Sequence, residues 1–260
     1  MNKYIILSHY RSGSSVLNES IAPGHNCKIA FEILHESLLF DNTNFDVKPV
    51  IKKLYGFENW PVHKQRFHPS YDALYGKDLS DLFGNQISDL VDLRSYFFYC
   101  KDNFEGFKIM SQQLSFDSVL WSALETCKVV HVYRKNYLAQ LASLLLAKKT
   151  NVWQNIKHNE KVTINPRLAL AYFTHMDFLL DFIWRKYPGR LEIEFDELKN
   201  WDSVVRKFQD FVGLRQSNLI LKPKYEGNFM DSIQRINNLC ELKKFFSDSK
   251  YEIFFKQVLR

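Results

Sequence analysis

Residues Tyr4–Leu17, YIILSHYRSGSSVL, decide the fold of this chain. The apolar run Tyr4–Leu7 predicts a short buried strand, and a helix is expected to begin at Ser14. Such a strand–loop–helix passage directs unpaired backbone N–H groups and a helix N-terminus at one point, which suits an anion. A plain turn followed by an N-cap would use the same Gly and Ser residues. This stretch alone leaves the two interpretations evenly matched.

The side chains of the loop add to the anion interpretation. Arg11 supplies a planar, permanently charged fork of donors, and hydroxyls follow at Ser12, Ser14 and Ser15 around Gly13. The loop resembles a phosphate-binding loop, but it lacks the Gly-Lys-Ser/Thr ending of nucleoside-triphosphate enzymes. The predicted ligand is therefore an anion other than magnesium-bound ATP.

Composition places the chain among ordinary globular proteins. Its 260 residues are 46% hydrophobic and 25% charged, which suits one large domain or one domain with an insertion. The formal charge of +6 favours anionic ligands, but the basic residues are dispersed and no nucleic-acid recognition motif occurs. We therefore expect a small anion, acidic glycan or lipid headgroup rather than nucleic acid.

The cysteines and the lengths of the apolar runs predict the cellular compartment of the protein. The cysteines are isolated, without a CxxC pair or zinc spacing, which is typical of free thiols in a reducing compartment. The run Tyr4–Leu7 is too short for a signal peptide core, and Leu141–Ala147 is far too short to span a membrane. We expect a cytoplasmic protein without a membrane span.

Short apolar runs alternate with amphipathic stretches along the chain. Strands are predicted at Tyr4–Leu7, Gly106–Met110, Lys128–Tyr133 and Leu191–Phe195. Helices are predicted at Ser14–Ile21, Ile87–Tyr99, Phe116–Glu125, Asn136–Lys149, Arg167–Lys186, Asp196–Val212 and, with a break near Ser247–Ser249, Ile233–Leu259. This alternation predicts an α/β fold, a P-loop-like three-layer α/β/α arrangement with a mainly parallel central sheet flanked by helices.

The chain carries no linker or repeat, so we expect one domain over residues 1–260. Residues 41–83 are less regular and rich in aromatics, and they form either a substrate-side insertion or a structural excursion. Ligands of such sheets lie beyond the carboxyl ends of the strands. The loop at Arg11 and the residues after Met110 and Tyr133 should therefore share one edge.

A second segment, Val129–Ser143, has the same predicted order of strand, polar loop and helix as the first. Its strand ends in the cations Arg134 and Lys135, a helix follows at once, and Ser143 lies about two turns along that helix. A basic loop together with a hydroxyl further down the helix suits a second phosphate. His131 within the strand is more typical of a core histidine.

With these two segments the chain resembles the sulfotransferases that use 3′-phosphoadenosine-5′-phosphosulfate (PAPS). It is most similar to bacterial carbohydrate sulfotransferases of the trehalose 2-sulfotransferase type, and more distantly to tyrosylprotein sulfotransferases. Arg11–Ser15 match their Arg-Ser-Gly-Ser/Thr-Ser/Thr loop, which holds the 5′-phosphosulfate. Supporting matches occur at Gly106–Met110, Trp153 and Glu197-Leu198, so the resemblance extends over about residues 4–215.

The resemblance implies roles at the other phosphate. In the family a strand followed by basic residues, with a Ser eight residues on, holds the 3′-phosphate, which assigns that phosphate to Arg134, Lys135 and Ser143. Lys135 stands where the family usually has Arg. Which of Arg134 and Lys135 holds the 3′-phosphate, or whether both do, therefore stays open. Lys222 and Lys224 correspond to a late basic loop that closes over the 3′-phosphate in many relatives.

The implied reaction is in-line sulfuryl transfer from PAPS to a hydroxyl. Glu32 matches the catalytic Glu of the trehalose-type and tyrosylprotein enzymes, with Glu36 and His35 as rivals for the general base. Lys108 resembles the Lys that stabilises the transition state, although it also suits a surface Lys on an edge strand. Protein cations such as Arg11 and Lys108 then act without magnesium, and no metal is expected.

The acceptor and the assembly stay open. A carbohydrate, a glycolipid or a small metabolite would each supply a hydroxyl, and a homodimer is possible. A P-loop kinase or nucleotidase is disfavoured because the first loop has Arg11 and no Gly-Lys-Ser/Thr. A non-catalytic homologue that binds PAPS or its product is the remaining alternative.

Overall fold

The computed structural model describes residues 3–15, 17, 29–32, 98, 101–102, 104–111, 118–152, 160–214 and 231–256. The chain divides into two compact units. The sheet unit comprises Met1–His9, Gly13–Tyr133 and Tyr187–Pro223, and the helical unit comprises Tyr10–Ser12, Arg134–Lys186 and Lys224–Arg260. The anion loop therefore leaves the sheet unit at His9 and returns to it at Gly13.

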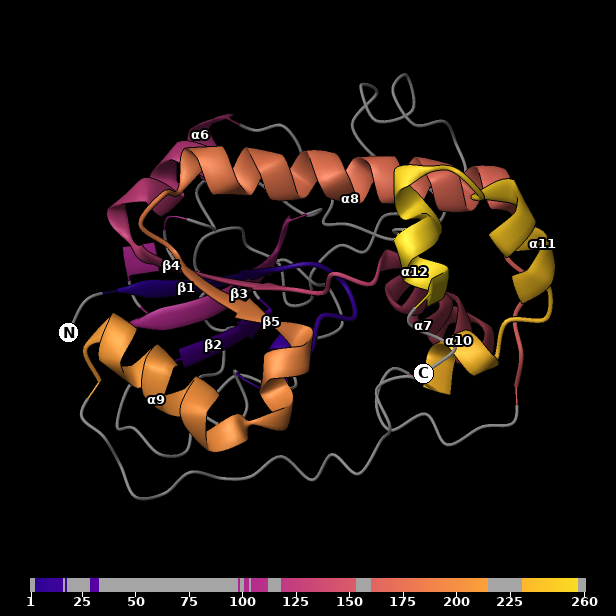
Figure 1. Ribbon diagram of the computed structural model, residues 1–260. Helices are drawn as coiled ribbons and strands as arrows, with labels where there is room; N and C mark the ends of the chain where they lie inside the picture. Colours follow the sequence, from indigo (N-terminus) through magenta and orange to yellow (C-terminus); the bar gives the residue numbers. More distant parts are fainter. Residues whose placement is uncertain are drawn as a thin grey trace, which may run out of the picture. The chain divides into compact units, whose positions relative to one another are not determined.

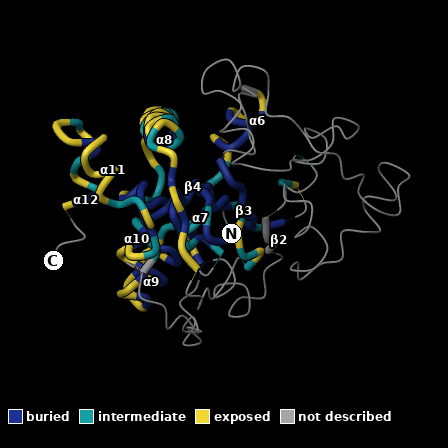
Figure 2. Tube along the Cα trace, turned by 90° about the vertical axis from the view of Figure 1, so that its right-hand side faces the viewer, coloured by how far each residue is buried: buried dark blue, intermediate teal, exposed yellow. Residues whose placement is uncertain are grey.

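The sheet unit contains a parallel sheet of five strands in the order β2-β3-β1-β4-β5 (Figure 1). The strands are β1 (Tyr4–Ser8), β2 (Ile29–Glu32), β3 (Gly106–Met110), β4 (Lys128–Tyr133) and β5 (Leu191–Glu194). Every residue of β1 and β3 is buried, as expected for strands covered on both faces. Figure 2 shows β3 and β4 largely in the colour of buried residues.

The register aligns the carboxyl ends of the three central strands. Ser8 at the end of β1 lies opposite Met110 of β3 on one side and Val132 of β4 on the other. His9 and Ser111, the residues that directly follow β1 and β3, therefore leave the sheet at the same edge. Ligands of open parallel sheets bind at this edge.

A close approach at the opposite end of the sheet explains one glycine. A Cβ atom at Gly106 would lie 2.1 Å from the ring of Tyr4, its neighbour across β1 and β3. The buried Tyr4 ring also packs edge-on against Phe208, with 5.1 Å between ring centroids. Gly106 thus leaves the space in which the tyrosine ring packs.

Within the sheet unit, helices lie on both faces of the sheet. They are α6 (Ser118–Ala123), the 3-10 turns η3 (Leu124–Thr126) and η4 (Phe195–Lys199), and α9 (Trp201–Val212). Helix α9 buries one stripe, which includes Val204, Val205 and Phe208, and ends at Gly213 in a left-handed conformation with φ 77°. In Figure 1, α6 and α9 lie on opposite sides of the strands, which gives the three layers.

The helical unit packs around α7 (Tyr137–Thr150). Its other elements are α8 (Pro166–Lys186), α10 (Asp231–Gln234), α11 (Leu239–Phe245), η5 (Lys250–Glu252) and α12 (Ile253–Lys256). Helix α7 contacts α8, α10 and α12. Phe173 of α8 lies at the centre of an aromatic cluster, with its ring centroid 5.2 Å from those of Phe246, Tyr251 and Phe254.

The structure confirms the predicted α/β class and the predicted strands, with small shifts at the ends of β1 and β5. It adds β2, which the sequence analysis did not predict. The predicted helix Asp196–Val212 is interrupted, because Asn200 has non-helical backbone angles between η4 and α9. The predicted break near Ser247–Ser249 occurs between α11 and η5. The insertion predicted at 41–83 lies outside the described residues, and the single domain stays a prediction.

Candidate functional site

The loop after β1 has an unusual backbone. Arg11 has φ 60° and Gly13 has φ 82°, so two residues of this short loop lie in the left-handed region. A non-glycine residue in that region is uncommon and marks a functional loop or strain. Alternation of such residues turns successive N–H groups toward one point and makes a cradle for anions. The helical turn begins at Ser14, as predicted.

Gly13 is required by both its backbone and its surroundings. A Cβ atom there would lie 2.5 Å from Cδ1 of Leu198 and 3.0 Å from Cδ2 of Phe195. Both neighbours belong to η4 in the same sheet unit. Residue 13 therefore cannot carry a side chain without a shift in η4, and the tight turn depends on glycine.

Helix α7 contacts the part of the loop that belongs to the helical unit. Arg11 Nε donates to Ser143 Oγ at 3.0 Å, and Gln140 Nε2 donates to the carbonyl oxygen of Tyr10 at 2.6 Å. Gln140 and Ser143 are three residues apart and share one face of α7. The structure thus brings together two residues, Arg11 and Ser143, that the sequence analysis assigned to two different phosphates.

The junction between β4 and α7 carries the other predicted cations. Arg134 is buried, with 6% of its surface exposed, whereas Lys135 is exposed. Asn136 caps α7, since its side chain accepts a hydrogen bond from the N–H of Ala139 at 3.0 Å. The two cations that the sequence offers as alternatives therefore differ in burial: the guanidinium of Arg134 is enclosed and the ammonium of Lys135 faces the solvent.

Lys108 lies inside the sheet unit. It stands in β3, which has β2 and β1 as neighbours, so the alternative of a surface lysine on an edge strand is wrong. None of its surface is exposed, and Nζ donates to Ser15 Oγ at 2.8 Å. A buried ammonium needs such partners because desolvation is costly. Lys108 therefore brings a positive charge to the first turn after the anion loop.

Glu32, the predicted general base, is the last residue of β2. It pairs with Lys108 in the sheet register, next to an irregularity between Ala30 and Glu32. The candidate base and the candidate transition-state cation therefore occupy neighbouring strands. A strand position was not predicted for Glu32.

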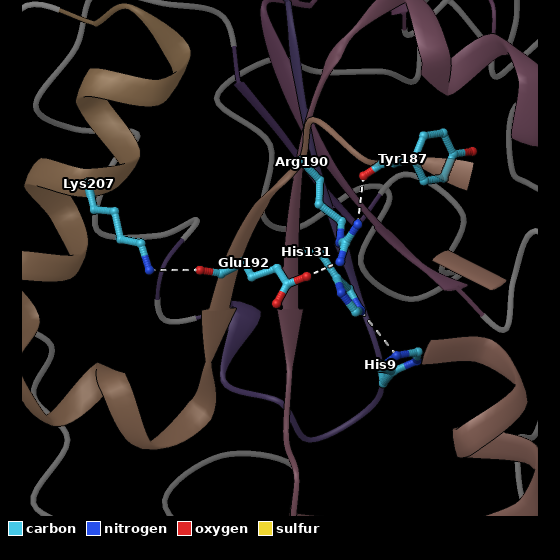
Figure 3. A network of polar contacts seen from close by, with 6 residues as sticks. All are labelled: His9, His131, Tyr187, Arg190, Glu192 and Lys207. Atoms are coloured by element: carbon cyan, nitrogen blue, oxygen red, sulfur yellow. Dashed lines mark hydrogen bonds and ion pairs between the residues drawn. The ribbon is translucent and has the colours of Figure 1, made fainter. Parts of the chain in front are cut away.

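Sequence reasoning missed a row of buried polar side chains, Ser111, His9 and His131, and Figure 3 shows the contact between the two histidines. His9 Nδ1 lies 2.6 Å from Ser111 Oγ, and its Nε2 lies 3.3 Å from Nε2 of His131. All three side chains are fully buried. Burial lowers the pKa of His9 to about 3 and holds the pKa of His131 well below its ordinary value. Both imidazoles are neutral at pH 7, and His131 is the core histidine expected from sequence.

Polar contacts continue across β5 in Figure 3. Arg190 Nη1 donates to the carbonyl oxygen of Tyr187 at 2.8 Å, and Arg190 also forms an ion pair with Glu192. Lys207 of α9 donates to the backbone oxygen of Glu192 at 3.0 Å. These contacts tie the edge strand β5 to α9 and to the segment before it.

Other candidates cannot be placed. The rival bases His35 and Glu36, together with Trp153, Lys222 and Lys224, lie outside the described residues. Among the residues that the structure does describe, no helix is long and apolar enough to cross a membrane. Within the same residues, no group of three or more His, Cys, Asp or Glu side chains is arranged to hold a metal ion.

Comparison with solved structures gives only a distant likeness. No protein-family model matches the chain, and no curated protein matches it. The chain is similar to a solved structure described as a sulfotransferase domain from the curacin biosynthetic pathway, with 13% sequence identity and a TM-score of 0.44. The similarity covers 99% of this chain and 96% of that one. A likeness of this size says nothing about the activity of this chain.

Proposed function

We propose that the chain is a PAPS-dependent sulfotransferase that transfers the sulfuryl group to a hydroxyl of a carbohydrate, a glycolipid or a small metabolite. The observation that carries the proposal is the hydrogen bond between Arg11 and Ser143, at 3.0 Å. These residues come from two strand–loop–helix segments, each suited to an anion. The bond shows that the two segments meet, and a ligand with two phosphate-like groups would offer one group to the donors of each segment.

The loop residues have distinct tasks in this proposal. The left-handed backbone at Arg11 and Gly13 directs N–H groups at the 5′-phosphosulfate, and Ser12, Ser14 and Ser15 add hydroxyl donors. We assign the binding of the 3′-phosphate to Ser143 and Arg134. Lys135, Lys222 and Lys224 remain further proposed contacts of that phosphate.

The chemical step needs a proton acceptor and stabilisation of the leaving group. The acceptor oxygen forms a bond to sulfur while the bond from sulfur to the 5′-phosphate oxygen breaks. We assign the acceptor proton to the carboxylate of Glu32, and the charge that develops on the phosphate oxygen to Arg11 and Lys108. Buried Lys108 is fixed by Ser15, so little reorganisation is needed when that charge develops.

Binding is the first test of the proposal. Thermal unfolding of the whole chain is measured with 3′-phosphoadenosine-5′-phosphate (PAP), with ATP and magnesium, and in buffer alone. A ligand that binds only the folded state at about 100 times its dissociation constant stabilises it by about 2.7 kcal/mol. We expect PAP to stabilise the chain and ATP with magnesium to do so much less. The reverse order would favour a kinase or nucleotidase.

Transfer is the second test. The chain is incubated with sulfur-labelled PAPS and a panel of sugars, glycolipids and small alcohols, and mass spectrometry detects the addition of one sulfuryl group. Glu32→Gln should abolish transfer and keep PAP affinity. Binding of PAP without transfer to any acceptor would support the non-catalytic alternative instead.

A further inference from the structure

We propose that His9 is a positioning residue of the anion loop, whose imidazole links Ser111 after β3 to His131 of β4 and fixes where the loop leaves β1. This inference rests on the proposed function, because it concerns the same loop. It adds a residue to which the sequence analysis gave no role.

The argument begins with the place of His9 in the sheet. It directly follows β1, the central strand, and its ring contacts groups from both neighbouring strands. Ser8, the preceding residue, adds a contact between its Oγ and the sulfur of Met110 at 3.1 Å. The ends of β1 and β3 are therefore joined by two consecutive side-chain contacts.

The Nδ1 atom of His131 indicates the direction of the hydrogen bonds between His131, His9 and Ser111. Nδ1 of His131 is buried and has no hydrogen-bond partner among the described residues. A buried N–H without an acceptor is rarer than an acceptor without a donor, so the proton of His131 belongs on Nε2. His131 then donates to Nε2 of His9, and Nδ1–H of His9 donates to Ser111 Oγ.

This direction requires both imidazoles to stay uncharged. Protonation of His9 would direct its Nε2–H at the Nε2–H of His131 and separate the rings. Ser111 and His131 both contact His9, and Tyr133 stacks on His131 with ring centroids 5.1 Å apart. The charge of Arg190 also opposes protonation of His131. The surroundings thus favour the uncharged form of both imidazoles.

The consequence reaches the residues that bind the anion. Arg11 lies two residues after His9, and Lys108 lies three residues before Ser111. The bond between His9 and Ser111 therefore fixes the point at which the loop that carries Arg11 leaves the sheet, next to the end of the strand that carries Lys108. Misplacement of positioned groups by about 1 Å is enough to weaken catalysis strongly.

Two conservative variants separate the two bonds of His9. Asparagine places an amide N–H where Nδ1 stands, so His9→Asn keeps the bond to Ser111. Glutamine places its amide near Nε2, so His9→Gln keeps the link to His131 and loses Ser111. We expect His9→Gln and Ser111→Ala to weaken PAP binding by about tenfold, as for one lost hydrogen bond, and His9→Asn to stay within about threefold of wild type.

A control separates positioning from stability. Tyr187→Phe removes another buried hydrogen bond of the sheet unit, the one from its hydroxyl to the backbone oxygen of Trp121. It should lower the unfolding temperature while leaving PAP affinity unchanged. Affinity is measured by calorimetry well below each variant's unfolding temperature, so that only folded protein is compared.

Hydrogen exchange of the amides of residues 11–15 gives a readout that needs no ligand. Exchange should be faster in His9→Gln and Ser111→Ala than in His9→Asn or Tyr187→Phe. If wild type fails to bind PAP, the proposed function fails, and the exchange pattern still tests the positioning role. If loop exchange in His9→Gln equals that in Tyr187→Phe, the positioning role is overturned, whether or not wild type binds PAP.

Discussion

The two cations to which we assign a role in transfer each contact a serine, but their surroundings differ. Arg11 in the helical unit has a left-handed backbone, is partly exposed and donates to Ser143 from α7. Lys108 in the sheet unit stands on a central strand, is fully buried and donates to Ser15. From this contrast we expect Arg11 to contact the ligand directly, whereas Lys108 would hold a positive charge away from water.

The largest expected effect concerns Arg11. Arg11→Ala removes several charge-assisted hydrogen bonds to the ligand, so PAP affinity should fall by about 100-fold, equivalent to about 2.7 kcal/mol. Titration calorimetry measures the change. Arg185→Ala is the matched control, because Arg185 is an exposed arginine whose partner is Asp181 within α8. A loss of similar size in the control would show that general charge, not Arg11, governs binding.

Lys108 should behave differently. Lys108→Met keeps the length of the side chain, removes its buried charge and should lower the rate of sulfuryl transfer by about 30-fold, or about 2 kcal/mol. The free energy of unfolding should stay the same or rise, because replacing a buried charged group with an apolar one is often neutral or stabilising. Single-turnover kinetics and urea unfolding measure the two quantities. A variant that unfolds easily but transfers normally would reverse our distinction between the two cations.

A pair of glycines tests the loop backbone. Gly13→Ala suffers both a positive φ and a close contact with Leu198, whereas Gly213→Ala has a positive φ and open space around its Cβ. We expect Gly213→Ala to cost about 1 kcal/mol of unfolding free energy and Gly13→Ala about 1 kcal/mol more. Urea unfolding of both variants measures the difference. Equal losses would mean that η4 yields to the added methyl group.

The smallest expected effect is the pH dependence of the buried histidines. Their pKa values are lowered in the folded state, from 6.5 to about 3 for His9, so the unfolded state binds more protons below pH 6.5. Stability should therefore fall as pH falls from 6.5, by about 1 kcal/mol for His9 between pH 6.5 and 5.5. His9→Asn should show a shallower loss over this range. Identical profiles of stability against pH for His9→Asn and wild type would show that the lowered pKa of His9 does not contribute to this loss.

Sequence patterns predicted the parts of the site better than their contacts. The runs of β1, β3 and β4 were recognisable because each is apolar, short and bounded by polar residues. β2 was missed, because Ile29–Glu32 has only four residues and continues directly into Ile33-Leu34 with no turn signal to mark its end. Burial of Lys108 depends on strand order, and strand order in a parallel sheet is not encoded locally.

The same limit explains the histidines. His9 and His131 are separated by 122 residues, and only the parallel register of β1 and β4 brings their rings together. Arg11 and Ser143 were both predicted as ligands of the cosubstrate, but their direct hydrogen bond was not. Residue types indicated the chemistry, and tertiary pairing determined which groups meet.

The central place of β1 has a consequence for the order in which the chain folds. Its two partners begin at residues 106 and 128, so about 100 residues separate β1 from the nearest strand with which it pairs. Pairings so distant in sequence form slowly, because a long loop must close before any contact compensates for its entropy. The anion loop that follows β1 is therefore expected to be among the last segments to acquire its shape.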